Sequence, residues 1–193
     1  MQDAVTIVSG LPRSGTSMMM QMLDNGGIEV ITDGVRAADT DNPRGYYELE
    51  KVKRLKYDAS WLPEARGKAF KMVSQLLYDL PASETYRVLF MERDFDEMLH
   101  SQEKMLQRLG RPSAPREQII PAYKQHLEQL HDWLGQQTNF AVLNVSYNAL
   151  LDRSEAEARR VIAFLGDRGD VEGMARSVDT TLYRNRGPAA GTA

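Results

Sequence analysis

A tight loop bounded by two glycines, close to the N-terminus, constrains this sequence more than any other feature. The apolar segment 5–8 is typical of a buried β-strand, the loop after it contains Gly10, Pro12 and Gly15, and the Met-rich segment from Thr16 favours a helix. A strand, a glycine-containing loop and a helix N-terminus in this order direct backbone N–H groups and partial positive charge toward one point. The sequence therefore predicts an anion-binding site at this loop.

The spacing of the two loop glycines narrows the kind of anion. Gly10 and Gly15 are separated as in the phosphate-binding P-loop, but Thr16 occupies the position of the P-loop lysine. That lysine contacts the β- and γ-phosphates of a bound nucleoside triphosphate. Arg13 supplies a planar cation suited to phosphate or sulfate oxygens, and Ser17 adds a hydroxyl. The loop favours a phosphate-like group over a magnesium-bound triphosphate.

The loop resembles the 5′-phosphosulfate-binding loop of sulfotransferases that use 3′-phosphoadenosine 5′-phosphosulfate (PAPS). The stretch 41–48, with Asn42, Pro43 and the pair Tyr46–Tyr47, also resembles a segment that follows this loop in many bacterial sulfotransferase-like proteins. The resemblance implies a nucleotide-binding protein with PAPS as cofactor and 3′-phosphoadenosine 5′-phosphate (PAP) as product. It implies that the loop binds this cofactor through Pro12, Arg13, Ser14, Gly15, Thr16 and Ser17.

A second motif follows the apolar strand predicted at 87–93. Arg93 ends that strand, Asp94 is placed to cap the next helix, and Ser101 lies eight residues after Arg93. This spacing resembles the 3′-phosphate motif of the same family, which implies that Arg93 and Ser101 bind the 3′-phosphate. The Asn-Pro that the family has between the two is replaced here by Asp94 and Phe95. In a nucleotide hydrolase Asp94 would hold magnesium, but the adjacent Arg93 charge opposes a metal there.

Further site residues are predicted outside these motifs. Glu48 follows a glycine-containing loop and is our candidate for the base that removes the acceptor proton, with His100 as a second candidate. Lys71 lies near the end of a strand predicted at 68–73, where ligands of α/β sheets bind. The family has a late basic segment that covers the nucleotide, which implies cofactor contacts for Arg184 and Arg186.

The alternation of apolar strands with helical segments predicts a three-layer α/β/α domain with a mainly parallel sheet of about five strands. The strands are expected at 5–8, 28–31, 68–73, 87–93 and 140–145, and helices at 16–23, 48–61, 76–80, 95–109, 113–137 and 158–165. The resemblance adds a P-loop nucleotide-kinase-like strand order. One sulfotransferase-like domain is expected over 1–187, followed by a disordered tail over 188–193.

Composition limits the partners. The chain has 193 residues, a net charge of −3 and no cysteine, which gives no support for broad nucleic-acid or anionic-membrane binding and excludes thiolate catalysis. The N-terminal segment lacks the features of a secretory signal, so we expect a cytoplasmic protein. The expected partner is a small-molecule or carbohydrate acceptor, with no metal required. The sequence does not determine the oligomeric state, and a homodimer is compatible with it.

These observations lead to one favoured function and two alternatives. The favoured function is in-line transfer of a sulfuryl group from PAPS to a hydroxyl or amine, with Arg13 and the loop stabilising the leaving phosphate. A P-loop nucleotide kinase or NTPase would instead have to bind ATP and magnesium despite Thr16. A non-catalytic protein that binds PAPS or PAP is the third hypothesis.

Overall fold

Four parallel strands form the central sheet of the computed structural model, which describes residues 4–34 and 45–179. Their order is β2-β1-β3-β4, and their bounds are β1 (Val5–Gly10), β2 (Ala69–Lys71), β3 (Tyr86–Glu92) and β4 (Phe140–Ser146). This confirms the α/β class and the parallel sheet, in a P-loop kinase-like arrangement. The expected strand at 28–31 forms only an isolated bridge between Val30 and Ala69. Because β2 has only three residues, it provides little edge for a further strand to pair with.

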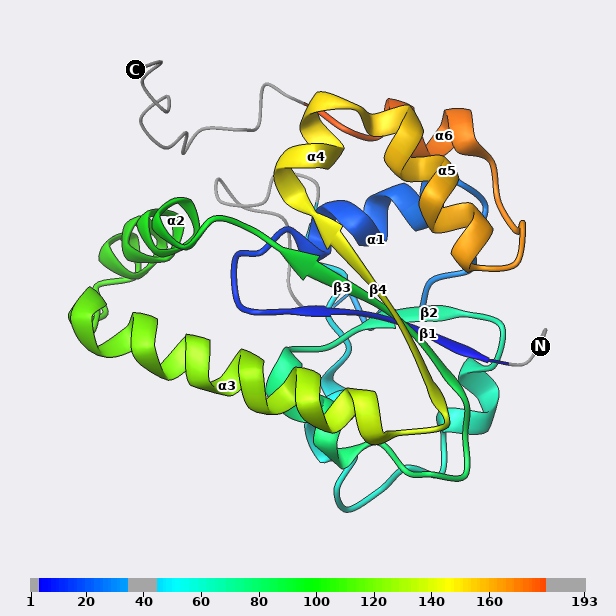
Figure 1. Ribbon diagram of the computed structural model, residues 1–193, viewed down its shortest axis with the longest axis horizontal. Helices are drawn as coiled ribbons and strands as arrows, with labels where there is room; N and C mark the ends of the chain where they lie inside the picture. Colours follow the sequence, from blue (N-terminus) through cyan, green and yellow to red (C-terminus); the bar gives the residue numbers. More distant parts are fainter. Residues whose placement is uncertain (1–3, 35–44, 180–193) are drawn as a thin grey trace.

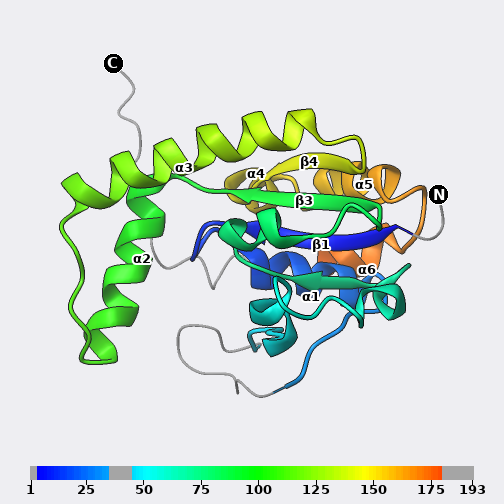
Figure 2. The same cartoon turned by 90° about the horizontal axis from the view of Figure 1, so that it is seen from below.

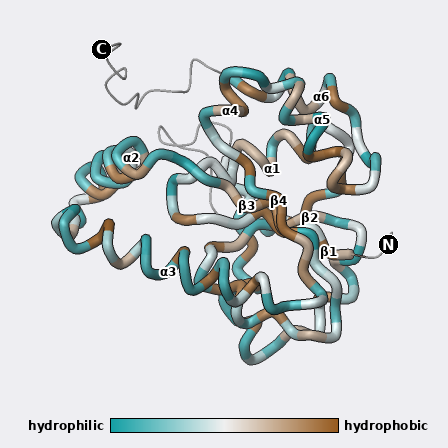
Figure 3. Tube along the Cα trace, viewed as in Figure 1, coloured by the Kyte–Doolittle hydropathy of each residue, from teal (hydrophilic) through white to brown (hydrophobic). Residues whose placement is uncertain are grey.

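The two faces of the sheet are covered by different helices (Figure 1). One face packs against α1 (Thr16–Asn25), α5 (Ser154–Phe164) and α6 (Val171–Arg176), with α4 (Tyr147–Asp152) directly after β4. The other face packs against α3 (Arg116–Gln136) and the segments around the 3₁₀ helices η1 (Glu50–Arg54), η2 (Leu62–Ala65) and η3 (Ser74–Asp79). Figure 3 shows that hydrophobic residues are concentrated in the central strands, between these two layers.

The prediction of a continuous helix over 48–61 is wrong. The structure has only the 3₁₀ helix η1 there, followed by turns. The buried residues in and beside η1, Leu49, Val52 and Leu55, recur every three residues. A 3₁₀ helix has three residues per turn, so it places all three side chains in one row facing the core, which an α-helix does not. The helix predicted at 76–80 is likewise the 3₁₀ helix η3.

Helix α2 (Phe95–Arg108) projects beyond the carboxyl ends of the strands, and α3 returns from it across the sheet (Figure 2). Asp94 caps α2 as predicted, since its carboxylate accepts hydrogen bonds from the N–H groups of Asp96 (3.0 Å) and Glu97 (3.1 Å). An ion pair between Arg116 and Glu103, at 2.7 Å, joins α3 to α2.

His126 on α3 is packed rather than catalytic. Its Nε2 lies 2.9 Å from the hydroxyl of Ser74, a residue with no exposed surface. Burial, with a smaller contribution from His131, lowers the pKa of His126 below its usual 6.5. His131 packs edge-on against Phe90, with ring centroids 5.3 Å apart. His126 therefore serves packing on the face of the sheet that α3 covers, whereas His131 is exposed apart from its contact with Phe90.

The lowered pKa of His126 predicts a specific acid sensitivity. Because the unfolded chain takes up a proton at His126 more readily than the folded chain, stability is lost as the pH falls through about 6.5. His126→Gln replaces the imidazole with an amide that can still form a hydrogen bond but does not titrate. We expect wild type to lose more unfolding free energy than His126→Gln between pH 7.5 and 5.5, measured by urea denaturation. Equal losses in the two proteins would contradict the assignment.

Candidate functional site

The loop after β1 folds tightly against the end of the sheet. Gly10 has φ +151°, and a Cβ there would lie 2.6 Å from the Ser14 hydroxyl and 2.7 Å from the Met91 carbonyl oxygen. Gly15 has φ +102°, and a Cβ there would lie 2.4 Å from the ring of Tyr147. Arg13 also has a positive φ, of 69°. The two predicted glycines are therefore required both by backbone conformation and by close approach.

The loop opens onto a pocket of about 790 Å³, within the size range of small-molecule sites. Pro12, Arg13, Gly15, Thr16 and Ser17 line it, as expected for an anion site. Ser14 is not among the described lining residues. Its side chain is buried, and its hydroxyl has no hydrogen-bond partner among the residues that the structure describes. The Ser14 side chain therefore does not face the pocket, unlike those of its neighbours Arg13 and Thr16.

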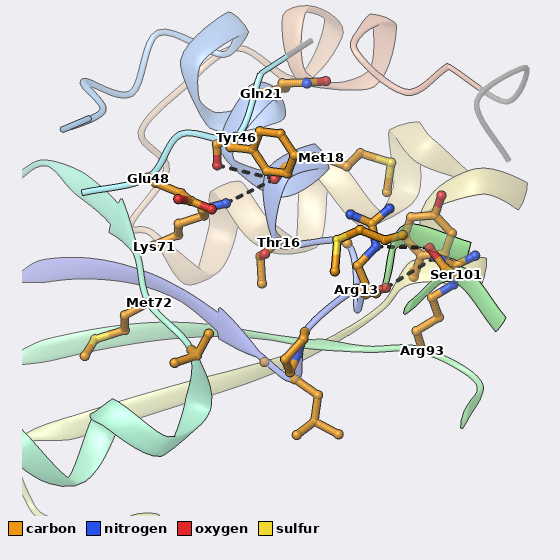
Figure 4. Close-up of a pocket in the computed structure, with 18 of the residues that line it drawn as sticks. Arg13, Thr16, Met18, Gln21, Tyr46, Glu48, Lys71, Met72, Arg93 and Ser101 are labelled. Carbon is orange, nitrogen blue, oxygen red and sulfur yellow. Dashed lines mark hydrogen bonds between the residues drawn. The ribbon is translucent and has the colours of Figure 1, made fainter. Parts of the chain in front are cut away.

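The two sequence motifs meet at one end of the pocket (Figure 4). The Arg13 Nε donates a hydrogen bond to the Ser101 Oγ at 3.0 Å, although 88 positions separate the two residues. Arg93 Nη1 donates to the Arg13 carbonyl oxygen at 3.3 Å. Arg13, Arg93 and Ser101 all line the pocket. Sequence reasoning assigned these residues to two motifs, and the structure brings the motifs into direct contact.

Arg93 is more enclosed than the sequence indicated. Its Nε lies 3.2 Å from the Glu97 carboxylate, and only 7% and 6% of the two side chains are exposed. The guanidinium also lies 4.2 Å from the centroid of the Tyr147 ring. Asn148 donates a hydrogen bond to Glu97 at 3.4 Å. Burial raises the pKa of the Tyr147 phenol, which therefore contacts Arg93 as a neutral ring.

Three residues of this cluster were missed from the sequence: Glu97, Tyr147 and Asn148. Glu97 lies four residues after Arg93, a spacing that could have indicated the ion pair. Tyr147 and Asn148 begin α4, after β4, and only the neighbouring positions of β3 and β4 in the sheet bring them to Arg93. Lys104 and Arg108 were also missed. They line the pocket three and seven residues beyond Ser101, on the same face of α2.

The other end of the pocket holds Lys71, at the carboxyl end of β2 as predicted. Lys71 Nζ donates a hydrogen bond to the Ser17 hydroxyl at 3.2 Å and lies 5.8 Å from the centroid of the Tyr46 ring. Ser17 Oγ in turn donates to the Tyr46 carbonyl oxygen at 3.4 Å. Glu48 lines the same end, and Figure 4 shows it extending toward the same region as Lys71. This β2 lysine supplies a cation to the loop although Thr16 replaces the P-loop lysine.

One described candidate lies outside this pocket, and several predicted positions are not described. His100 is exposed on α2 and is not among the described lining residues. Arg184, Arg186, the tail over 188–193 and positions 41–44 lie outside the described residues. Within residues 4–34 and 45–179, no three His, Asp or Glu side chains are grouped so as to hold a metal ion. None of the described helices is long and apolar enough to cross a membrane.

Two solved structures share this architecture over most of their length. A sulfotransferase from Alicyclobacillus acidocaldarius aligns with a TM-score of 0.50 and 15% identity, covering 87% of this chain and 84% of that one. The sulfotransferase domain from the curacin biosynthetic pathway aligns with a TM-score of 0.52 and 12% identity, covering 95% and 87% respectively. This chain has a sulfotransferase-like fold.

A third solved structure, an unliganded sugar kinase from Janibacter sp. HTCC2649, aligns with a TM-score of 0.46 and 12% identity over 85% of this chain and 95% of that one. No family model matches the sequence, and no curated protein matches it either. The function must therefore be argued from the site residues themselves rather than from the sulfotransferase-like fold.

The donor set at the loop fits a ligand with more than one anionic group. The loop forms a cradle that is lined by Arg13, Thr16 and Ser17. Lys71 reaches this cradle from one side. Ser101, Lys104 and Arg108 extend the donor surface along α2 on the other side. This arrangement suits phosphate and sulfate oxygens, which arginine and lysine bind by charged hydrogen bonds.

Proposed function

We propose that this protein is a PAPS-dependent sulfotransferase that moves a sulfuryl group to a hydroxyl acceptor. The observation that carries the proposal is the Arg13–Ser101 hydrogen bond, because it joins the candidate 5′-phosphosulfate loop to the candidate 3′-phosphate motif on one pocket wall. Thr16 in place of the P-loop lysine further favours this ligand over ATP with magnesium.

The roles of the pocket residues follow from their charge and position. PAPS would supply the sulfuryl group. Arg13, with the Thr16 and Ser17 hydroxyls, would hold the oxygens on which negative charge develops as the 5′-phosphate leaves. Lys71, already hydrogen-bonded to Ser17, would add positive charge at the same point. Glu48, on the Lys71 side, would accept the proton of the acceptor hydroxyl.

The second anionic group of the cofactor is assigned to the α2 end of the pocket. Ser101 would donate its hydroxyl there, and Arg93, Lys104 and Arg108 would supply positive charge. Because Arg93 is paired with Glu97, its interaction with a phosphate would compete with that carboxylate. We therefore expect Arg13 to contribute more to cofactor affinity than Arg93.

Calorimetric titration with PAP and with ATP plus magnesium tests the proposal. We expect wild type to prefer PAP, and Arg13→Ala to lose about 2 kcal/mol of PAP binding free energy, the scale of a charged hydrogen bond. Ser101→Ala should lose less, because it removes a neutral donor. Arg111→Ala is the matched control, since Arg111 is an exposed cation that is not among the described lining residues. Preference for ATP with magnesium would overturn the sulfotransferase assignment in favour of a kinase.

A further inference from the structure

One wall of the pocket is apolar. It consists of five side chains, here called the apolar wall: Leu49, Val52, Met72, Val73 and Leu76. Leu49, Val52 and Met72 belong to the hydrophobic core on the α3 side of the sheet, and Leu76 packs against that core. Val73 is 43% exposed, which is high for a large hydrophobic side chain. The pocket thus exposes an edge of the core to whatever enters it.

The apolar wall is contiguous in sequence with the two candidate chemical groups at its end of the pocket. Glu48 directly precedes Leu49, and Lys71 directly precedes Met72. Figure 4 shows Met72 on the same side as Lys71 and Glu48, with Arg13 and Ser101 on the opposite side of Thr16. A molecule with its hydroxyl beside Glu48 would therefore have its body against the apolar wall.

The apolar wall helps to choose between the two kinds of acceptor that the sequence left open, a carbohydrate and another small molecule. A carbohydrate carries polar hydroxyls around its ring, and burying them against Leu, Val and Met side chains leaves hydrogen bonds unmade. An aromatic or aliphatic body gains free energy from the same burial. The charged pair of Glu50 and Lys53, joined at 2.5 Å, is 52% and 62% exposed and belongs to the solvent-facing rim.

We propose that the apolar wall is the acceptor subsite. The acceptor would be a hydroxyl compound with an apolar body, such as a phenol or an apolar alcohol. This inference rests on the proposed function, which assigns the Arg13 and Ser101 end to the nucleotide. In the transfer, a bond forms between sulfur and the acceptor oxygen. The bond between sulfur and the bridging oxygen of the 5′-phosphate breaks, and the acceptor proton passes to Glu48.

Binding of 2-naphthol, compared with N-acetylglucosamine, tests this subsite by calorimetry on the protein saturated with PAP. We expect 2-naphthol to bind together with PAP and N-acetylglucosamine not to bind. Leu76→Asn should weaken 2-naphthol at least tenfold and leave PAP affinity unchanged, which also verifies that the variant is folded. Val73→Thr, at an exposed position, should weaken 2-naphthol about threefold. Leu109→Asn is the matched control, since Leu109 is 49% exposed and is not among the described lining residues.

Three results would overturn the inference: tighter binding of N-acetylglucosamine than of 2-naphthol, displacement of 2-naphthol by PAP, or unchanged 2-naphthol affinity in both wall variants. Displacement would identify the wall as the site of the adenine ring. Failure of the proposed function would be recognised by a different result, since PAP itself would then not bind. In that case the 2-naphthol titrations on the protein alone, with the same variants, still decide whether the wall is a site for apolar alcohols.

Discussion

Replacing Gly15 with alanine is expected to destabilise the protein by about 3 kcal/mol, from a positive φ of roughly 1–2 kcal/mol and from overpacking. The added Cβ would lie 2.4 Å from Tyr147 Cδ2, closer than non-bonded carbon atoms approach. Tyr147 is itself held against Arg93, so the ring has little freedom to withdraw. We also expect PAP affinity to fall at least tenfold, because relief of the clash moves the loop that lines the pocket.

Gly27→Ala is the matched control for Gly15→Ala. Gly27 also has a positive φ, of 79°, but a Cβ there has nothing within 4 Å. This variant should therefore show the backbone cost alone, about 1 kcal/mol, and unchanged PAP affinity. Urea denaturation gives the free energies and calorimetry gives the affinities. Equal destabilisation in the two variants would show that contact between Gly15 and Tyr147 does not constrain the loop.

Replacing Glu97 with alanine is expected to cost about 3 kcal/mol of stability, the scale for breaking a buried ion pair from one side. The substitution removes the carboxylate that forms the ion pair with Arg93. Both side chains are nearly inaccessible to water. If Arg93 binds a cofactor phosphate, that phosphate replaces the missing negative charge. PAP should then stabilise Glu97→Ala by more than it stabilises wild type, as measured by urea denaturation with and without PAP.

Glu103→Ala provides the comparison on the same helix. Glu103 pairs with Arg116, but about a third of each side chain is exposed. The loss there should stay below about 1 kcal/mol, and PAP should stabilise this variant as it does wild type. A Glu97→Ala protein no less stable than Glu103→Ala would contradict the buried-pair assignment. An equal PAP effect in Glu97→Ala and wild type would show that Arg93 positions the Arg13 carbonyl rather than binding phosphate.

Local sequence patterns determined several parts of this structure. The apolar segment before Gly10 and the helix from Thr16 follow from residue composition and propensity within each segment. The Asp94 cap likewise depends only on the next three residues. The parallel sheet follows from the alternation of apolar strands with helices. These features could be predicted because propensity, capping and backbone geometry act over short distances along the chain.

Other elements could not be predicted locally because packing decided them. The segment around Leu49, Val52 and Leu55 has helical composition, but the core takes up a side chain every third residue and the backbone follows as a 3₁₀ turn. The segment 28–31 has strand composition, but its neighbour β2 is too short to pair with more than Val30. Tertiary contacts overrode local preference in both places.

The sequence by itself determined a phosphate-type loop without the P-loop lysine, and an Arg93–Ser101 pair after a core strand. Only the tertiary structure decided that Arg13 contacts Ser101, that Glu97 and Tyr147 enclose Arg93, and that an apolar wall continues from Lys71. The physical reason is the same in each case. These contacts join residues from different strands and helices, and their distances depend on sheet order and helix packing rather than on spacing along the chain.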